Sequence, residues 1–250
     1  MREIHRGKFG GNDIAAETMK DVNCSQDVML MEARIMSQLS HPNVVQLYGV
    51  VTQSLPVIKV TELMQNGNLL SHLRQYRLSL IKDIDALTNM CRQVCSGMEY
   101  LHNRGYIHRN LAAKSCLVGN NRTVKVADFS LARYVRKEEP VTYASYKFKW
   151  APPEVLYHQA GSFRSDVWSY GVLMWEIFTC GQEPFSDVTN AVYKENIRSK
   201  RYRLSKPATC TTEIYRIMTL CWALVSNIVT VAAQSNLKEL DEIDDSVSKY

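Results

Sequence analysis

Two polar tripeptides in this chain of 250 residues carry the residue types needed for phosphoryl transfer. They are His108–Arg109–Asn110 and Asp128–Phe129–Ser130. Between them, apolar runs at Cys116–Val118 and Val124–Ala127 flank a Gly-Asn-Asn turn, the pattern of a β-hairpin. A hairpin brings its two ends together, so the tripeptides are expected to meet. One loop can then orient an acceptor hydroxyl while the other holds a metal ion.

The elements that must position these loops follow from the apolar periodicity. Apolar side chains recur at helical spacing over residues 25–39 and, most clearly, over 84–102. The stretch Ser165–Phe178 is apolar on nearly every side, which predicts a buried central helix. Residues 44–51 and 57–61 are predicted to form a β-hairpin. Two further helices are predicted over residues 187–199 and 211–222.

Three glycines lie near the N-terminus, in the string Arg6–Gly7–Lys8–Phe9–Gly10–Gly11. Glycines allow a tight turn whose backbone approaches phosphate groups. On these residues alone, an irregular N-terminal loop without a ligand is the favoured interpretation.

The pattern changes from strands to helices after the turn at Asn66–Gly67. This change predicts an α+β fold with two lobes in a single domain. The small, β-rich lobe is expected over residues 1–64, the large helical lobe over 65–222, and a divergent tail over 223–250.

Composition narrows the class of protein. A net charge of +5, with no compact block of Lys and Arg among aromatic residues, argues against a nucleic-acid partner. No apolar run reaches the ~18 residues of a transmembrane segment. The seven cysteines form no CxxC pair and have no histidine at metal spacing. Reduced thiols in the cytoplasm are therefore expected.

Several longer strings occur in a fixed order: Thr61–Glu62 before the Gly-Asn linker, IHRNLAAK, VKVADFSLARYV, KWAPPEVL and SDVWSYGVLMWEIFTCG. Together they resemble the catalytic domain of a cytoplasmic protein tyrosine kinase, most of all the Tec group, with Src and Abl kinases next. The resemblance extends from about residue 5 to Trp222. It implies a bilobal protein-kinase-like fold with ATP in the cleft, and partners among the proteins of tyrosine-kinase signalling.

The resemblance also assigns roles to individual positions. Thr61 becomes the gatekeeper, and Glu62 and Met64 belong to the hinge that holds the adenine. His108 and Phe129 stack with Met36 and Leu47 into a spine that joins the lobes, and Asp166 anchors the loop at His108. The implied nucleotide-binding positions are Gly7, Gly10, Ala15, Thr61, Glu62, Met64 and Leu117.

Catalytic positions depart from the family pattern in the large lobe. Asn110 stands where the family has the aspartate that takes the hydroxyl proton, next to Arg109. The metal ligand Asp128 is retained, but the second ligand is replaced by Ser115, a weaker donor. Ser130 replaces a glycine, which restricts the backbone.

The small lobe departs further. The resemblance places the phosphate-gripping lysine fifteen residues before Glu32, where this chain has Glu17. Two carboxylates there are expected to repel each other and the ATP phosphates. Lys20 is the nearest replacement, although its strand position points it to the opposite face. The glycine-rich lid is also expected to be incomplete, with His5 in place of its first glycine.

Two further losses concern the substrate side. Two residues of the docking loop are missing between Phe148 and Lys149, and Glu154 lacks its arginine partner because no Arg follows Arg216. Tyr143 and Tyr146 lie in the activation loop, as phosphorylation sites or as exposed tyrosines without function.

Three functional interpretations remain open. The leading one is a catalytically impaired tyrosine-kinase-like domain, a pseudokinase that acts through protein interaction and binds ATP and Mg²⁺ weakly. The second is an active but slow tyrosine kinase. The third is a truncated or decaying kinase with no evolved activity.

Overall fold

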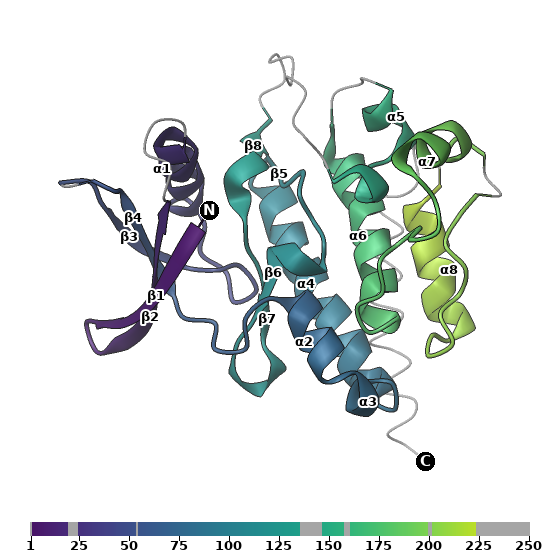
Figure 1. Cartoon of the computed structure of the whole chain (residues 1–250), viewed down its shortest axis with the longest axis horizontal. Helices are drawn as coiled ribbons and strands as arrows, with labels where there is room; N and C mark the ends of the chain where they lie inside the picture. Colours follow the sequence, from purple (N-terminus) through teal and green to yellow (C-terminus); the bar gives the residue numbers. More distant parts are fainter. Residues whose placement is uncertain are drawn as a thin grey trace.

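A computed structural model describes residues 2–19, 25–53, 55–135, 147–157, 161–199 and 202–223. The described chain has a β-sheet region with one helix at its N-terminal end and a larger helical region after it (Figure 1). The predicted α+β class and two-lobed, kinase-like architecture are confirmed. The proposed boundary at residue 64 stays a prediction, and the tail lies outside the described residues except for Ala223.

The N-terminal sheet consists of β1 (Arg2–Phe9), β2 (Asn12–Met19), β3 (Leu47–Val51) and β4 (Ile58–Glu62). Its strand order is β1-β2-β4-β3, and every neighbouring pair is antiparallel. The predicted hairpin of residues 44–51 and 57–61 is therefore confirmed as β3 and β4. This order places β2 and β4 at the centre, where their side chains can meet across the ladder.

The expectation of an irregular N-terminal loop was wrong. Residues 2–9 form the edge strand β1, joined to β2 by Gly10 and Gly11. Both glycines have positive φ, 56° and 83°, which a two-residue hairpin turn requires. The strand was not recognisable because its apolar residues Ile4 and Phe9 are largely exposed and so follow no core-facing alternation.

Helix α1 (Ser25–Met36) packs beside the sheet, as the helical spacing over 25–39 predicted. It buries Met29, Ala33 and Met36 along one face. The buried charge of Glu32 lies on this helix too, which brings a carboxylate to the inner side of the sheet region.

The helical region surrounds the central helix α6 (Figure 1). Helix α4 buries Leu87, Met90, Val94 and Leu101 at the predicted spacing, and Asp83 caps its start through the N–H of Ala86. Nearly all of α6 is buried, also as predicted. The helices are α2 (Leu69–Gln75), α3 (Arg77–Leu80), α4 (Ile84–Asn103), α5 (Pro153–Leu156), α6 (Phe163–Phe178), α7 (Asn190–Asn196) and α8 (Thr212–Cys221).

Two small sheets lie between the regions. Strands β5 (Tyr106–Ile107) and β8 (Arg133–Tyr134) form one, and β6 (Cys116–Val118) and β7 (Val124–Val126) form the other. The second is the predicted hairpin between the polar loops. Its β7 also ties the two regions together, because Val126 accepts from the N–H of Val45 at 2.9 Å.

Glu154 on α5 was expected to lack its usual arginine partner. It is half-buried, and burial raises the pKa of its carboxyl. A backbone hydrogen bond and, to a smaller extent, the positive charge of Arg164 on α6 oppose this rise.

Tyr143 and Tyr146 lie outside the described residues. Within the described part of the chain, no helix is long and apolar enough to cross a membrane.

Candidate active site

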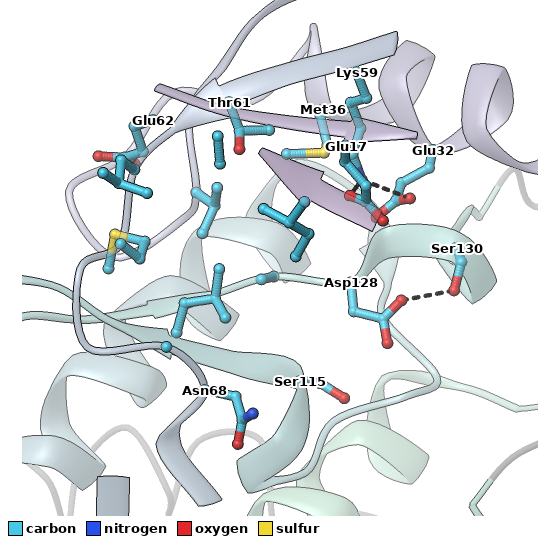
Figure 2. A pocket seen from close by; sticks show the side chains of 18 of the residues that line it. Glu17, Glu32, Met36, Lys59, Thr61, Glu62, Asn68, Ser115, Asp128 and Ser130 are labelled. Carbon is cyan, nitrogen blue, oxygen red and sulfur yellow. Dashed lines mark hydrogen bonds and ion pairs between the residues drawn. The ribbon is translucent and has the colours of Figure 1, made fainter. Parts of the chain in front are cut away.

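A cleft of about 770 Å³ opens between the N-terminal sheet and the helical region (Figure 2). Strands β1, β2 and β4, helix α1 and the connection after Glu62 line it from one side. The loops around Ser115 and Asp128 line it from the other. A volume of this size is ordinary for a site that holds a nucleotide-sized ligand.

The loop at His108 is fixed from below by a buried carboxylate. Asp166, at the start of α6, accepts from the backbone N–H of His108 at 2.7 Å and of Arg109 at 2.9 Å. These bonds confirm the predicted anchoring role of Asp166. Arg109 adopts a positive φ of 65° and is buried, so it supports the loop and does not line the cleft.

The two polar loops meet as the hairpin predicted. The side-chain amide of Asn110 donates to Asp128 Oδ2 at 2.6 Å. The residue in the position of the general base is thus a hydrogen-bond donor to the residue in the metal-ligand position. An amide cannot take the proton of an acceptor hydroxyl at neutral pH.

Asp128 lies at a positive φ of 57° and points its carboxylate into the cleft. Its second oxygen, Oδ1, accepts from Ser130 Oγ at 2.8 Å, the bond drawn in Figure 2. Ser130 therefore does more than restrict the backbone, since its hydroxyl binds the carboxylate directly. Each oxygen of the metal ligand accepts a hydrogen bond from a substituted residue.

Ser115, in the position of the second metal ligand, is also engaged. Its hydroxyl donates to the carbonyl oxygen of Asn110 at 2.5 Å and accepts from Lys147 Nζ at 3.1 Å. Sequence reasoning did not assign a role to Lys147. The available signal was the shortened docking loop, which begins one residue later.

These contacts make a poor magnesium site. Mg²⁺ needs several oxygen ligands in near-octahedral geometry and keeps waters around it. Here one carboxylate already accepts two hydrogen bonds, and the neighbouring hydroxyl is held by an ammonium group. The side chains present do not fit the pair of metal ligands that the kinase resemblance implies.

Glu32 reaches the cleft from α1. Its Oε1 accepts from the backbone N–H of Phe129 at 3.1 Å, and its Oε2 lies 2.8 Å from Lys59 Nζ. Phe129 is buried against His108, with ring centroids 5.3 Å apart, and Met36 is buried as well. The helix, the Asp128 loop and the sheet are thereby linked through one carboxylate.

Lys59 on β4 is the site residue that sequence reasoning missed. Its ammonium lies 2.9 Å from Glu17 and 2.8 Å from Glu32, between the two carboxylates (Figure 2). Glu17 and Lys59 are directly opposed across β2 and β4. The expected repulsion between the carboxylates is therefore offset by a cation from the neighbouring strand.

A sequence signal for Lys59 existed. It lies two residues before Thr61, and residues two apart on a strand share a face. A gatekeeper at Thr61 already implied that Lys59 faces the cleft. Lys20, the replacement considered from sequence, lies outside the described residues.

The cleft contains most of the predicted nucleotide-binding positions. Ala15, Thr61, Glu62, Met64 and Leu117 all line it. The carboxylate of Glu62 is held by Lys125, at 2.7 Å and 2.8 Å, which stiffens the connection to the helical region.

The N-terminal glycines lie elsewhere. Gly7 and Gly10 are not among the residues that line the cleft, where β1 contributes Ile4 and Arg6 instead. Gly10 belongs to the β1–β2 turn. The short hairpin therefore offers a basic side chain to the cleft, not a glycine-rich backbone loop.

Comparison with known proteins identifies the family to which this chain belongs. The family model for protein tyrosine and serine/threonine kinases matches residues 4–228. The chain is 48% identical over 223 residues to tyrosine-protein kinase Btk of Drosophila melanogaster, covering 88% of this chain and 28% of that protein. It is 43% identical over 222 residues to human tyrosine-protein kinase TXK, covering 88% of this chain and 42% of TXK.

A third relative is tyrosine-protein kinase Abl of Drosophila melanogaster, 45% identical over 216 residues, covering 85% of this chain and 13% of Abl. The chain thus spans less than half the length of each of these relatives. The predicted order of resemblance, the Tec group and then Abl, is confirmed. The chain belongs to the protein tyrosine and serine/threonine kinase family.

Proposed function

We propose that this kinase domain binds a nucleoside triphosphate in its cleft, is impaired in phosphoryl transfer, and acts through contacts with signalling proteins. One observation carries the proposal: the side-chain amide of Asn110 donates to the carboxylate of Asp128. The position that should accept a proton instead donates a hydrogen bond to Asp128, the residue in the metal-ligand position.

The loss of the base alone is costly. A positioned general base contributes about 10²- to 10⁴-fold to a reaction of this type. The substituted residues Ser115 and Ser130 add to the loss, because phosphoryl transfer depends on metal ions that neutralise charge on the phosphates. The substitutions weaken proton removal and metal binding together. A site with a single altered residue would lose only one of these functions.

Nucleotide binding is supported by the lining of the cleft. Lys59 faces the cleft and is held by Glu17 and Glu32, as a phosphate-contacting lysine must be held. Arg6 adds a second positive charge near the same sheet. Thr61 and Met64 supply the partly apolar wall that suits a base.

The experiment is a phosphotransfer assay with radiolabelled ATP and a generic tyrosine polymer. Wild type and Asp128→Ala are expected to give the same background signal. Turnover by the wild type that Asp128→Ala abolishes contradicts the proposal. ATP binding is measured on the same samples, so that lack of transfer is not confused with lack of nucleotide.

A slow tyrosine kinase is the second candidate, and Lys59 favours it by restoring an ion pair with Glu32. This candidate requires transfer above the Asp128→Ala background. It also requires that Lys59→Met lower both nucleotide affinity and the transfer rate. Transfer that survives Lys59→Met removes its support.

A cytoplasmic location and partners among tyrosine-kinase signalling proteins are part of the proposal. The relatives are tyrosine kinases by name. The cysteines of the described residues are free thiols, including Cys91, Cys116 and Cys221, which suits a reducing compartment. Phosphorylation at Tyr143 and Tyr146 stays a prediction.

A further inference from the structure

Lys147 lines the same cleft as Asp128, Ser115 and Ser130. Its ammonium donates to Ser115 Oγ at 3.1 Å, at the position where the family places its second metal ligand. Burial lowers the pKa of Lys147, while the charges of Glu176 and Asp128 oppose that shift. The ammonium therefore contacts one metal-ligand position and lies within electrostatic range of the other.

This lysine is built into its surroundings. Its Nζ lies 5.8 Å from the ring centroid of Trp150, within range of a cation–π contact. The buried carboxylate of Glu176 attracts it as well, and the same carboxylate accepts from Trp150 Nε1 at 2.8 Å. The side chain is thus held by the Ser115 hydroxyl and lies near the face of the Trp150 ring.

Lys147 directly precedes the short docking loop and faces the cleft. Phe148–Trp150 forms a 3₁₀ turn directly after Lys147. The resemblance to tyrosine kinases implies two further residues between Phe148 and Lys149, which this chain lacks. Lys149, two positions on, bonds instead to Glu183 and to the carbonyl oxygen of Phe185, so the two lysines have separate partners.

We propose that Lys147 acts as a built-in cation for the phosphate groups, so that the cleft binds nucleoside triphosphates without a divalent metal. An ammonium group supplies positive charge and three hydrogen-bond donors at one point. A magnesium ion at the same place is repelled by that charge. It also has to compete for the Asp128 carboxylate, which already accepts hydrogen bonds from Asn110 and Ser130. The inference rests on the proposed nucleotide binding.

Other cations of the cleft suit the same ligand. Lys59 and Arg6 approach from the sheet, while Lys114 and Lys147 approach from the loops of the helical region. A triphosphate between them can receive donors from both sides. Lys59 is already paired with two carboxylates, so Lys147 is the cation placed to replace the metal on the Asp128 side.

The test is isothermal calorimetry of ATP binding to the full chain, in EDTA and in magnesium chloride. Wild type is expected to bind ATP in EDTA with an affinity within about threefold of that in magnesium. Lys147→Gln is expected to lose on the order of tenfold to a hundredfold in EDTA, because a hydrogen bond to a charged group is removed. Lys149→Gln makes the same charge change outside the cleft and is expected to stay within about twofold.

The outcomes separate the two proposals. Binding only with magnesium overturns the role of Lys147 and leaves nucleotide binding intact. Absence of binding under both conditions overturns both. Equal losses in Lys147→Gln and Lys149→Gln show a general charge effect and also overturn it. Should Lys147→Gln fail to fold, titration of magnesium into the wild-type ATP mixture decides, since a large gain in affinity contradicts the proposal.

Discussion

At the scale of single residues, Lys59 supplies from β4 the positive charge that the kinase resemblance places on β2, and it keeps the ion pair with Glu32. The position expected to be lysine is Glu17, and the ammonium comes from the directly opposed residue on β4. Cross-strand neighbours lie about 5 Å apart, so a long side chain reaches either register position. Glu32 therefore keeps a cationic partner although its usual source is gone.

Lys59→Met is predicted to destabilise the fold by about 3–5 kcal/mol, because it leaves the carboxylates of Glu17 and Glu32 without the buried cation between them. Urea unfolding measures the change. The matched variant combines Glu17→Lys with Lys59→Ile, which returns the cation to β2. It is expected to recover most of the lost stability; failure to recover any of it contradicts the proposed exchange of positions.

Residue roles could be read from the sequence where a motif fixed the backbone around them. Asn110 contacts Asp128 as the hairpin predicts, and Asp166 binds the backbone of His108 as the buried helix start predicts. The spacing to Thr61 places Lys59 on the cleft face, but its pairing with Glu17 and Glu32 depends on the register between β2 and β4 and on the position of α1. The place of Lys147 depends on which loop reaches the cleft, and local sequence spacing carries little of that information.

At the scale of elements, helix α4 packs unusually closely against the loop before β3. A Cβ at Gly97 would lie 2.5 Å from the carbonyl oxygen of Asn43 and 3.0 Å from Val126 Cγ2. That carbonyl also accepts from the N–H of Val126 at 2.8 Å, so it cannot move freely. The loop before β3, which is hydrogen-bonded to β7 through Asn43, therefore packs directly against Gly97 of α4.

Gly97→Ala is predicted to destabilise the fold by about 1–3 kcal/mol through overpacking. This sign is informative, because alanine in an unobstructed helix interior stabilises by about 1 kcal/mol relative to glycine. Chemical denaturation measures the effect. Asn89→Ala, at an exposed position of the same helix, serves as the control, and a stabilised Gly97→Ala is the contradictory result.

Helix α6 carries a second testable feature, the buried carboxyl of Glu176. Burial raises its pKa from 4.5 to about 7, although it accepts from the N–H groups of Ala113 and Trp150 and Lys147 lies near. The folded state therefore holds a proton that the unfolded state releases at lower pH. The unfolding free energy from this group is greatest at acidic pH and falls as pH rises toward 7.

Glu176→Gln is predicted to remove that fall, because glutamine can accept the same two hydrogen bonds without titrating. Between pH 5 and pH 8, wild type should lose roughly 2–3 kcal/mol more unfolding free energy than the variant. Urea titrations at both pH values give the difference, in which other titrating groups cancel. Parallel pH dependence of the two proteins rules out a raised pKa at Glu176.

Elements with strong periodicity were predictable, and short or exposed ones were not. Helices α4 and α6 follow from spacing and from continuous apolar sequence. The edge strand β1 was missed because most of its side chains are exposed. Short helices such as α3 and α5 have too few residues to show a period, so their positions depend on packing.

At the scale of the whole molecule, the chain keeps the framework of a kinase, and we propose that the groups that would perform the reaction are altered. The buried core connects the Asp166 anchor, the Phe129 and His108 pair and the central helix. The changes concentrate at the cleft, where Asn110, Ser115 and Ser130 contact one another or Asp128. The fold was predictable because the order of the motifs specifies the framework. The same order does not specify which residues occupy the catalytic positions or what they contact.

The central claim is that the cleft binds ATP and leaves its γ-phosphate in place. Phosphorus NMR of ATP mixed with the full chain tests both halves at once, with a tyrosine polymer present. The ATP resonances are expected to shift or broaden on addition of protein while their integrated intensity stays constant over hours. Unperturbed resonances, or growth of a phosphotyrosine or inorganic phosphate signal that Asp128→Ala abolishes, contradict it.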